Sequence, residues 1–290
     1  MRRFSNFACV DWSGAAAERP PGIAVAHIGP DGPPALLSPQ PRWSRADVGE
    51  WLLQLAGDDA DILVGLDLSF GFPFADEGCF FPEWDDSPAD AKSLWAFIDR
   101  ICAADPHLTA GSFLSHPEGQ RHFRHSKDHV GDLFIGGTGR LRLVEAHQRA
   151  TRQANSWSCF NLVGAGQVGK SSLTGMRMLH QIGRYIPIWP FDPVPKRGPM
   201  LAEIYTTMAA RAAGMPAGRS KIRDRATLLS ALAALDSPAP VALSRYDDHS
   251  TDAMITAAWL RKNAGNEAFW HPEKLNMHIA ATEGWTFGVI

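Results

Sequence analysis

Acidic residues follow apolar runs at two places in the first quarter of the chain. Asp11 ends the apolar run 7–10 and is followed by Trp12-Ser13-Gly14, and Asp67 ends a second run and precedes Leu68-Ser69. A buried strand that ends in this way delivers a carboxylate to the edge of a sheet, and small residues after it leave space for a metal ion or a phosphate group. One such acid is a common feature, whereas the repetition predicts a shared carboxylate site.

Three further acids downstream could converge on the same place. Glu203 lies in a short strand-like segment, Asp252 lies near the start of a predicted helix, and Asp248 precedes it by one helical turn. Mg²⁺ and Mn²⁺ take oxygen ligands, and two such ions about 4 Å apart can clamp the attacking and leaving oxygens of a phosphodiester. The predicted catalytic acids are Asp11, Asp67, Glu203 and Asp252, and the predicted metal ligands are Asp11, Asp67, Asp248 and Asp252.

Each of these acids also has an ordinary structural explanation. Asp11 and Asp67 could simply form turns where their strands end. Glu203 could be an ion-paired surface residue, and Asp252 could be favoured by the dipole at a helix N-terminus. The cluster is therefore a hypothesis that requires the acids to be close together in the fold.

A glycine-rich stretch at residues 164–171 satisfies the P-loop pattern G-x-x-x-x-G-K-S. In a P-loop, backbone N–H groups hold the phosphates, Lys170 would reach the terminal ones and Ser171 would hold magnesium. The pattern predicts, as an alternative to a nuclease, a nucleotide-binding phosphotransfer protein or NTPase. Two features weigh against it, because the motif lies past the middle of the chain and the best downstream strand, 241–247, is interrupted by Arg245.

The charge distribution indicates which partners are possible. A formal net charge of -3 gives no overall attraction to nucleic acid, so DNA or RNA would have to bind a local basic patch. Basic residues gather at 211–225, and histidines gather at 115–132, where a solvated loop is the alternative. The candidate substrate contacts are Ser13, Lys170, Arg219 and Lys221.

The elements that must position these residues follow an α/β order. Strands are predicted at 7–11, 22–28 and 34–37, a helix from its N-cap Ser44 to Gly57, and a fourth strand at 61–67. This meander followed by helix and strand is the first half of a ribonuclease H-like fold. Later strands are predicted at 156–163, 185–189 and 201–206, with helices at 173–182 and 250–263.

The chain is expected to form one domain over residues 1–290, with 74–155 as a largely helical insertion after the fourth strand that covers or lines the site. Its four cysteines are scattered without C-x-x-C spacing, which gives no indication of a zinc site or a disulfide framework. No signal peptide or apolar stretch of membrane-spanning length is evident, so we expect a cytoplasmic protein without a membrane partner.

Several of these stretches together resemble the DUF429 family, whose members are predicted nucleases of the ribonuclease H-like superfamily. The resemblance implies a mixed sheet flanked by helices, a divalent-metal carboxylate site, and a G-x-G-x-V-G turn that needs no lysine after it. The chain departs from the family at Thr206, where proline is common. A non-catalytic binding protein that keeps the acids for structure is a further possibility. The matching stretches are 10–15, 65–73, 164–169, 202–205, 250–254 and 283–288.

Overall fold

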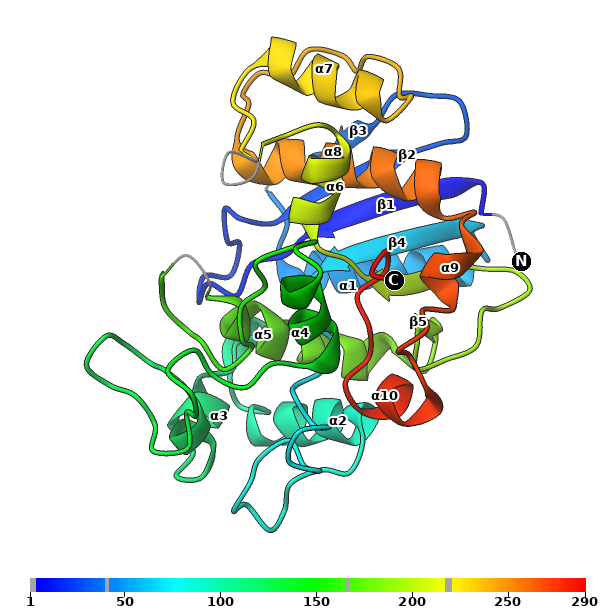
Figure 1. Cartoon of the computed structure of the whole chain (residues 1–290). Helices are drawn as coiled ribbons and strands as arrows, with labels where there is room; N and C mark the ends of the chain where they lie inside the picture. The colour runs from blue at the N-terminus through cyan, green and yellow to red at the C-terminus, as the bar shows by residue number, and fades with distance from the viewer. Residues whose placement is uncertain (1–3, 40–41, 165–166, 217–220) are drawn as a thin grey trace.

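A six-stranded mixed sheet forms the centre of the structure, a computed structural model that describes residues 4–39, 42–164, 167–216 and 221–290 (Figure 1). The strand order is β3-β2-β1-β4-β6-β5. The first three strands pair antiparallel, whereas β1, β4, β6 and β5 run parallel to one another. The strands are β1 (Asn6–Asp11), β2 (Ala24–Ile28), β3 (Ala35–Leu37), β4 (Ile62–Asp67), β5 (Ile188–Trp189) and β6 (Met200–Glu203).

The central strands β1 and β4 are apolar almost throughout because both faces of the sheet are covered. Successive residues point to opposite faces, so Val10 and Leu66 join one buried cluster while Cys9 and Leu63 join the other. All four of these side chains are fully buried. This packing fixes the register that brings the two strand ends together.

Helices cover both faces of the sheet (Figure 1). One face packs against α1 (Arg45–Gly57), α2 (Ala91–Ile101) and α5 (Val168–Ile182), and the other against α6 (Thr206–Ala212), α7 (Arg225–Ala234) and α8 (Asp248–Asn263). The shorter helices are α3 (Gly111–Ser115), α4 (Leu143–Ala150), α9 (Glu267–Trp270) and α10 (Met277–Thr282), with 3₁₀ turns at Pro106–Leu108 and Gly119–His122.

The helix starts follow local capping chemistry. Ser44 caps α1 as predicted, since its hydroxyl accepts from the Asp47 N–H at 3.0 Å and the Asp47 carboxylate accepts from the Ser44 N–H at 2.8 Å. Helix α8 begins two residues before the predicted Ser250. The reason is that Asp247 is the N-cap, and its carboxylate accepts from the Ser250 N–H at 3.0 Å.

The strand predicted at 156–163 is absent. This segment is irregular and makes only a single bridge, between Asn161 and Arg124, while the apolar Phe160 and Leu162 side chains are buried in the core. Aromatic residues of 74–155, among them Phe81 and Phe113, belong to the same buried cluster as β4 and α5. The region therefore contributes to the core, while its description as an insertion stays a prediction.

Within the described ranges, no helix combines the length and the apolar composition needed to cross a membrane.

Candidate active site

Asp11 and Asp67 end the neighbouring parallel strands β1 and β4 and are direct Cα partners in the sheet. The carboxyl ends of parallel strands lie at one edge, so both acids project from the same place in the fold. Asp11 is 8% exposed, and its Oδ2 lies 3.1 Å from Nδ1 of His249. Asp67 accepts hydrogen bonds from the N–H and the hydroxyl of Thr206, at 3.3 and 3.0 Å.

Helix α8 brings Asp252 and Asp248 to this edge, because it packs across β1 and β2. Lys221 Nζ lies 2.9 Å from Oδ2 of Asp252 and 3.9 Å from Oδ2 of Asp248, as expected for acids one helical turn apart on one face. Arg223 pairs with the same Asp248 oxygen at 3.1 Å. The other oxygen of Asp248, Oδ1, is buried and has no hydrogen-bond partner among the described residues.

The pKa values of Asp11, Asp67 and Asp252 are all raised in this setting, mainly by burial. Burial and, to a smaller extent, the charge of Asp11 together raise the pKa of Asp67 to about 8. Burial also raises the pKa of Asp252 to about 6 against the opposing charge of Lys221. The pKa of Asp11 is raised by burial and lowered by its hydrogen bond to His249. A cation placed among these groups would relieve both the desolvation and the repulsion.

The donor set suits a hard divalent cation in kind, since it consists of carboxylate oxygens. Among the residues that the structure describes, however, no three His, Cys, Asp or Glu side chains are grouped so that they could hold one metal ion. Asp11 and Asp252 instead face His249 and Lys221. An ion that binds here therefore has to compete with two internal partners.

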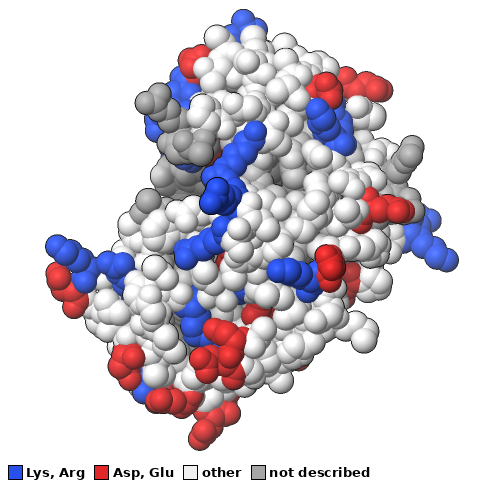
Figure 2. Space-filling model, in the orientation of Figure 1, with Lys and Arg blue, Asp and Glu red and all other residues white. Residues whose placement is uncertain are grey.

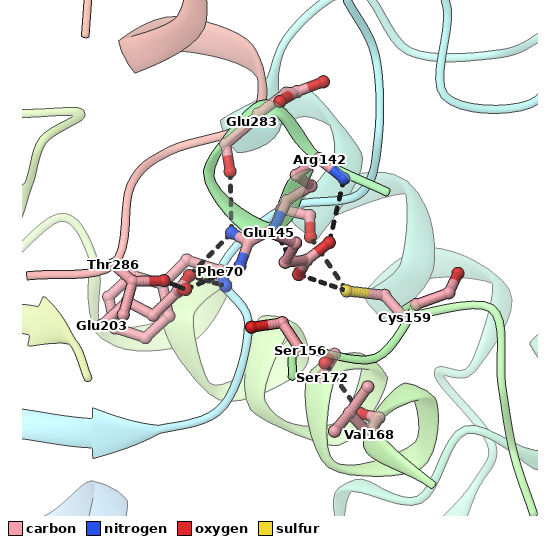
Figure 3. Close-up of polar contacts among 12 residues, drawn as sticks. Phe70, Arg142, Glu145, Ser156, Cys159, Val168, Ser172, Glu203, Glu283 and Thr286 are labelled. Atoms are coloured by element: carbon pink, nitrogen blue, oxygen red, sulfur yellow. Dashed lines mark hydrogen bonds and ion pairs between the residues drawn. The ribbon is translucent and has the colours of Figure 1, made fainter. Parts of the chain in front are cut away.

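Glu203 lies in a different setting from the acids at the ends of β1 and β4. It ends β6 and is 2% exposed, and both its oxygens accept from the guanidinium of Arg142 at 2.6 and 2.8 Å (Figure 3). The backbone N–H of Phe70 and the hydroxyl of Thr286 donate to the same carboxylate. Because all its acceptor positions are used, we infer a structural role for Glu203, while its catalytic role stays a prediction.

Arg142 is the centre of this buried network, which sequence reasoning missed. It also donates to Glu145 at 3.0 Å and to the Glu283 carbonyl at 3.0 Å. The Glu283 carboxylate in turn accepts from the backbone of Phe74, at 2.7 Å, and of Leu143, at 2.6 Å. The network thus joins the end of β6, the start of α4, the segment after β4 and the C-terminal segment (Figure 3). No local pattern distinguishes Arg142 from an exposed arginine.

A cavity of about 190 Å³ adjoins Asp67, between the ends of β4 and β6 and the start of α5. The buried network forms its inner wall, and Trp157, which is 38% exposed, stands at its edge. Its lining includes Trp12, Asp67, Ser69, Arg142, Glu145, Gln148, Trp157, Gln167, Ser171, Glu203, Tyr205 and Thr286.

Gly169 of the P-loop-like turn has a packing role, whereas a Cβ on Gly164 would meet no atom within 4 Å. A Cβ on Gly169 would lie 2.3 Å from the Cys159 carbonyl oxygen, and the Gly169 N–H donates to Asn161 at 3.1 Å. The Ser171 hydroxyl donates to the backbone at 2.8 Å. With the preceding strand absent as well, the local context that a P-loop requires is missing. Residues 165 and 166 of this turn lie outside the described residues.

Two of the predicted substrate contacts lie near each other, because Gly14, next to Ser13, packs against the backbone of Lys170 and Ser171, whereas Lys221 lies beside the acids of α8. Ser13 follows Asp11, and its carbonyl accepts from the buried Arg45 at 3.0 and 2.9 Å, which holds the turn in place. Lys170 is exposed at the start of α5, and Lys221 is bound to the acids of α8. Arg219 lies outside the described residues.

Basic side chains are nevertheless concentrated locally. Figure 2 shows Lys and Arg along the middle of one face and Asp and Glu mainly towards its lower part. Lys221 and Arg223, which pair with the acids of α8, have side chains that are 53% and 70% exposed. The acid cluster is therefore bordered by accessible positive charge, which sequence reasoning anticipated only as a cluster at 211–225.

Comparisons of the chain with protein-family models, curated proteins and solved structures find no match. The resemblance to DUF429 accordingly stays a prediction. Because a fold class hosts many activities, function has to be argued from the site itself.

Proposed function

We propose that the protein is a divalent-metal-dependent phosphodiester hydrolase, a nuclease, whose acids are Asp11, Asp67 and Asp252. The pairing of Asp11 with Asp67 at one edge of the sheet carries the proposal. Two adjacent carboxyls with raised pKa values, Asp11 buried and Asp67 half-buried, are costly to keep unless a bound cation or a reaction uses them. Asp252 adds a third carboxylate from a separate element.

The fold supports this assignment. A ribonuclease H-like protein would have an antiparallel meander of three strands joined to parallel strands. It would carry its acids at the ends of the first and fourth strands, as Asp11 and Asp67 are placed here. The final long helix carries the third acid, as the resemblance implies.

The residues would divide the work as follows. Asp11 and Asp67 would supply the first ligands to Mg²⁺ or Mn²⁺, and Asp252 would join them when the ion displaces Lys221. Asp248 lies one turn away and has an oxygen without a partner among the described residues. Such an ion, when bound, activates water and neutralises charge on the phosphate oxygens. Lys221 and Arg223 supply positive charge at the border of the site, which favours the approach of a polyanion.

The test compares variants that preserve shape. Asp11→Asn and Asp67→Asn are assayed on labelled single-stranded and duplex DNA and RNA with Mg²⁺ or Mn²⁺, beside Asp86→Asn, which changes an exposed acid. Loss of residues that only orient metal ligands costs about 10- to 100-fold, so loss of a ligand should cost at least about 100-fold. Full metal-dependent activity in Asp11→Asn would refute the proposal.

A further inference from the structure

Of the proposed metal ligands, Asp67 lines the cavity at the end of β4, and Asp11, Asp248 and Asp252 do not. The cavity is about 190 Å³ in volume and opens next to the carboxylate that would face the scissile phosphate. Any substrate held at Asp67 must therefore place a neighbouring group at or near its entrance. The nature of the walls indicates which group that is.

The inner wall consists of charged side chains, but these charges are paired with one another and are not available to a ligand. Arg142 is paired with Glu203 and Glu145, and all three side chains are at most 5% exposed (Figure 3). The acceptor atoms of Glu203 are occupied by four donors. A free ion would find no unpaired partner in this network, so the cavity suits an uncharged ligand with a rigid shape.

The outer walls are aromatic and amide-bearing. Trp12 is fixed by a 3.0 Å hydrogen bond from its Nε1 to Thr174, while Trp157 at the entrance is partly exposed. Tyr205 adds a third ring, and Gln167 adds a side-chain amide. Planar rings bind the faces of nucleobases and amides bind their edges, whichever base is present.

We propose that this cavity is a subsite for one nucleobase, belonging to the nucleotide next to the phosphate at Asp67. The inference rests on the proposed nuclease function for its choice of a nucleic acid. It adds that the substrate must present an unstacked base, as a single strand or a strand end does and the middle of a duplex does not.

The test measures nucleoside binding without metal. Adenosine, guanosine, cytidine and uridine are titrated by ligand-observed NMR in the presence of EDTA, with ribose as the control that lacks a base. Nucleosides avoid the repulsion that a phosphate would meet at Asp67. At least one nucleoside should bind 10-fold or more tightly than ribose.

Matched variants locate the binding. Loss of one stacking ring weakens binding about 5- to 100-fold, so Trp157→Ala should lose that factor while Trp157→Phe retains most of the affinity. Tyr185→Ala removes an exposed ring outside the cavity lining and should change nothing. Equal binding of ribose, no binding of any nucleoside, or unchanged binding by Trp157→Ala would each overturn the proposal.

The two proposals fail separately. Nucleoside binding that depends on Trp157 in a protein without nuclease activity would keep the subsite and remove the proposed reaction. Metal-dependent cleavage in a protein that binds no nucleoside would keep the proposed reaction and remove the subsite. An active enzyme should also cleave single strands at least 10-fold faster than the interior of a duplex of the same sequence, and equal rates would contradict the subsite.

Discussion

Replacement of Glu203 by glutamine is the most informative single change, because it separates a structural acid from a catalytic one. The substitution keeps the size and shape of the side chain and removes its charge. Each Glu203 oxygen accepts from Arg142 and from one further donor, either Phe70 N–H or the Thr286 hydroxyl. The new NH₂ group must therefore face two donors, whichever way the amide is turned.

The expected cost follows from burial. Arg142 and Glu203 are 1% and 2% exposed, so water has almost no access to the pair. Removal of one partner of such a pair costs about 3–5 kcal/mol. Arg142→Met should cost at least as much, because it leaves two buried carboxylates, Glu203 and Glu145, without their shared cation. Lys92→Met breaks an exposed ion pair and should cost less than about 1 kcal/mol.

Equilibrium unfolding in urea measures these differences, and metal-dependent nuclease activity is assayed below the unfolding transition. We expect Glu203→Gln to unfold at a much lower urea concentration than the wild-type protein. Wild-type stability combined with a selective loss of activity would show that Glu203 is a site acid and that the role assigned to the network is wrong.

Three further changes test other parts of the structure. Asp67→Asn should raise the free energy of unfolding by on the order of 2–4 kcal/mol at pH 7 and by little below pH 4, measured by urea unfolding across this range. The sign follows because the pKa of Asp67 rises from 3.8 to about 8 on folding. The contribution of Asp67 to stability is therefore complete below pH 3.8 and is lost as the pH rises towards 8. An equal gain at every pH would contradict this. Gly14→Ala should destabilise the fold by about 1–3 kcal/mol, because a Cβ there would lie 2.4 Å from the backbone nitrogen of Ser171. Gly32→Ala is the control, since a Cβ there meets no atom within 4 Å, and it should change the melting temperature little. Calorimetric titration of the wild-type protein with Mg-ATP should give no binding heat, and a binding heat that Lys170→Ala abolishes would restore the P-loop interpretation.

The parts of the fold that could be predicted are those specified by local sequence. The apolar runs of β1 and β4 are long because both faces of these strands are buried, and the capping box of Ser44 and Asp47 is a short-range interaction. The convergence of Asp11 and Asp67 was also predictable, since parallel neighbours present their carboxyl ends at one edge.

The parts that could not be predicted depend on contacts between distant residues. Segment 156–163 has the composition of a strand, yet its backbone pairs only briefly with Arg124 and its apolar side chains enter the core from a loop. Glu203 ends an apolar run just as Asp67 does, and only the position of Arg142, 61 residues earlier, distinguishes the two. His249, in contrast, could have been predicted to lie near the acids. It precedes Asp252 by three residues on one helix, and residues at this spacing are neighbours on the helix surface.

The partners of the carboxylates indicate where a cation would bind first. Glu203 has a permanent cation in Arg142 and Asp252 has one in Lys221, whereas Asp11 is paired with His249, which is charged only when protonated. Asp67 accepts only from the neutral N–H and hydroxyl of Thr206, and among the described residues it has no ion-pair partner. It is also the acid of the proposed cluster whose pKa is raised furthest among those with a stated value. In the proposed site, a divalent ion would therefore gain most at Asp67, and it would complete its site by displacing His249 from Asp11 at the paired position across the sheet.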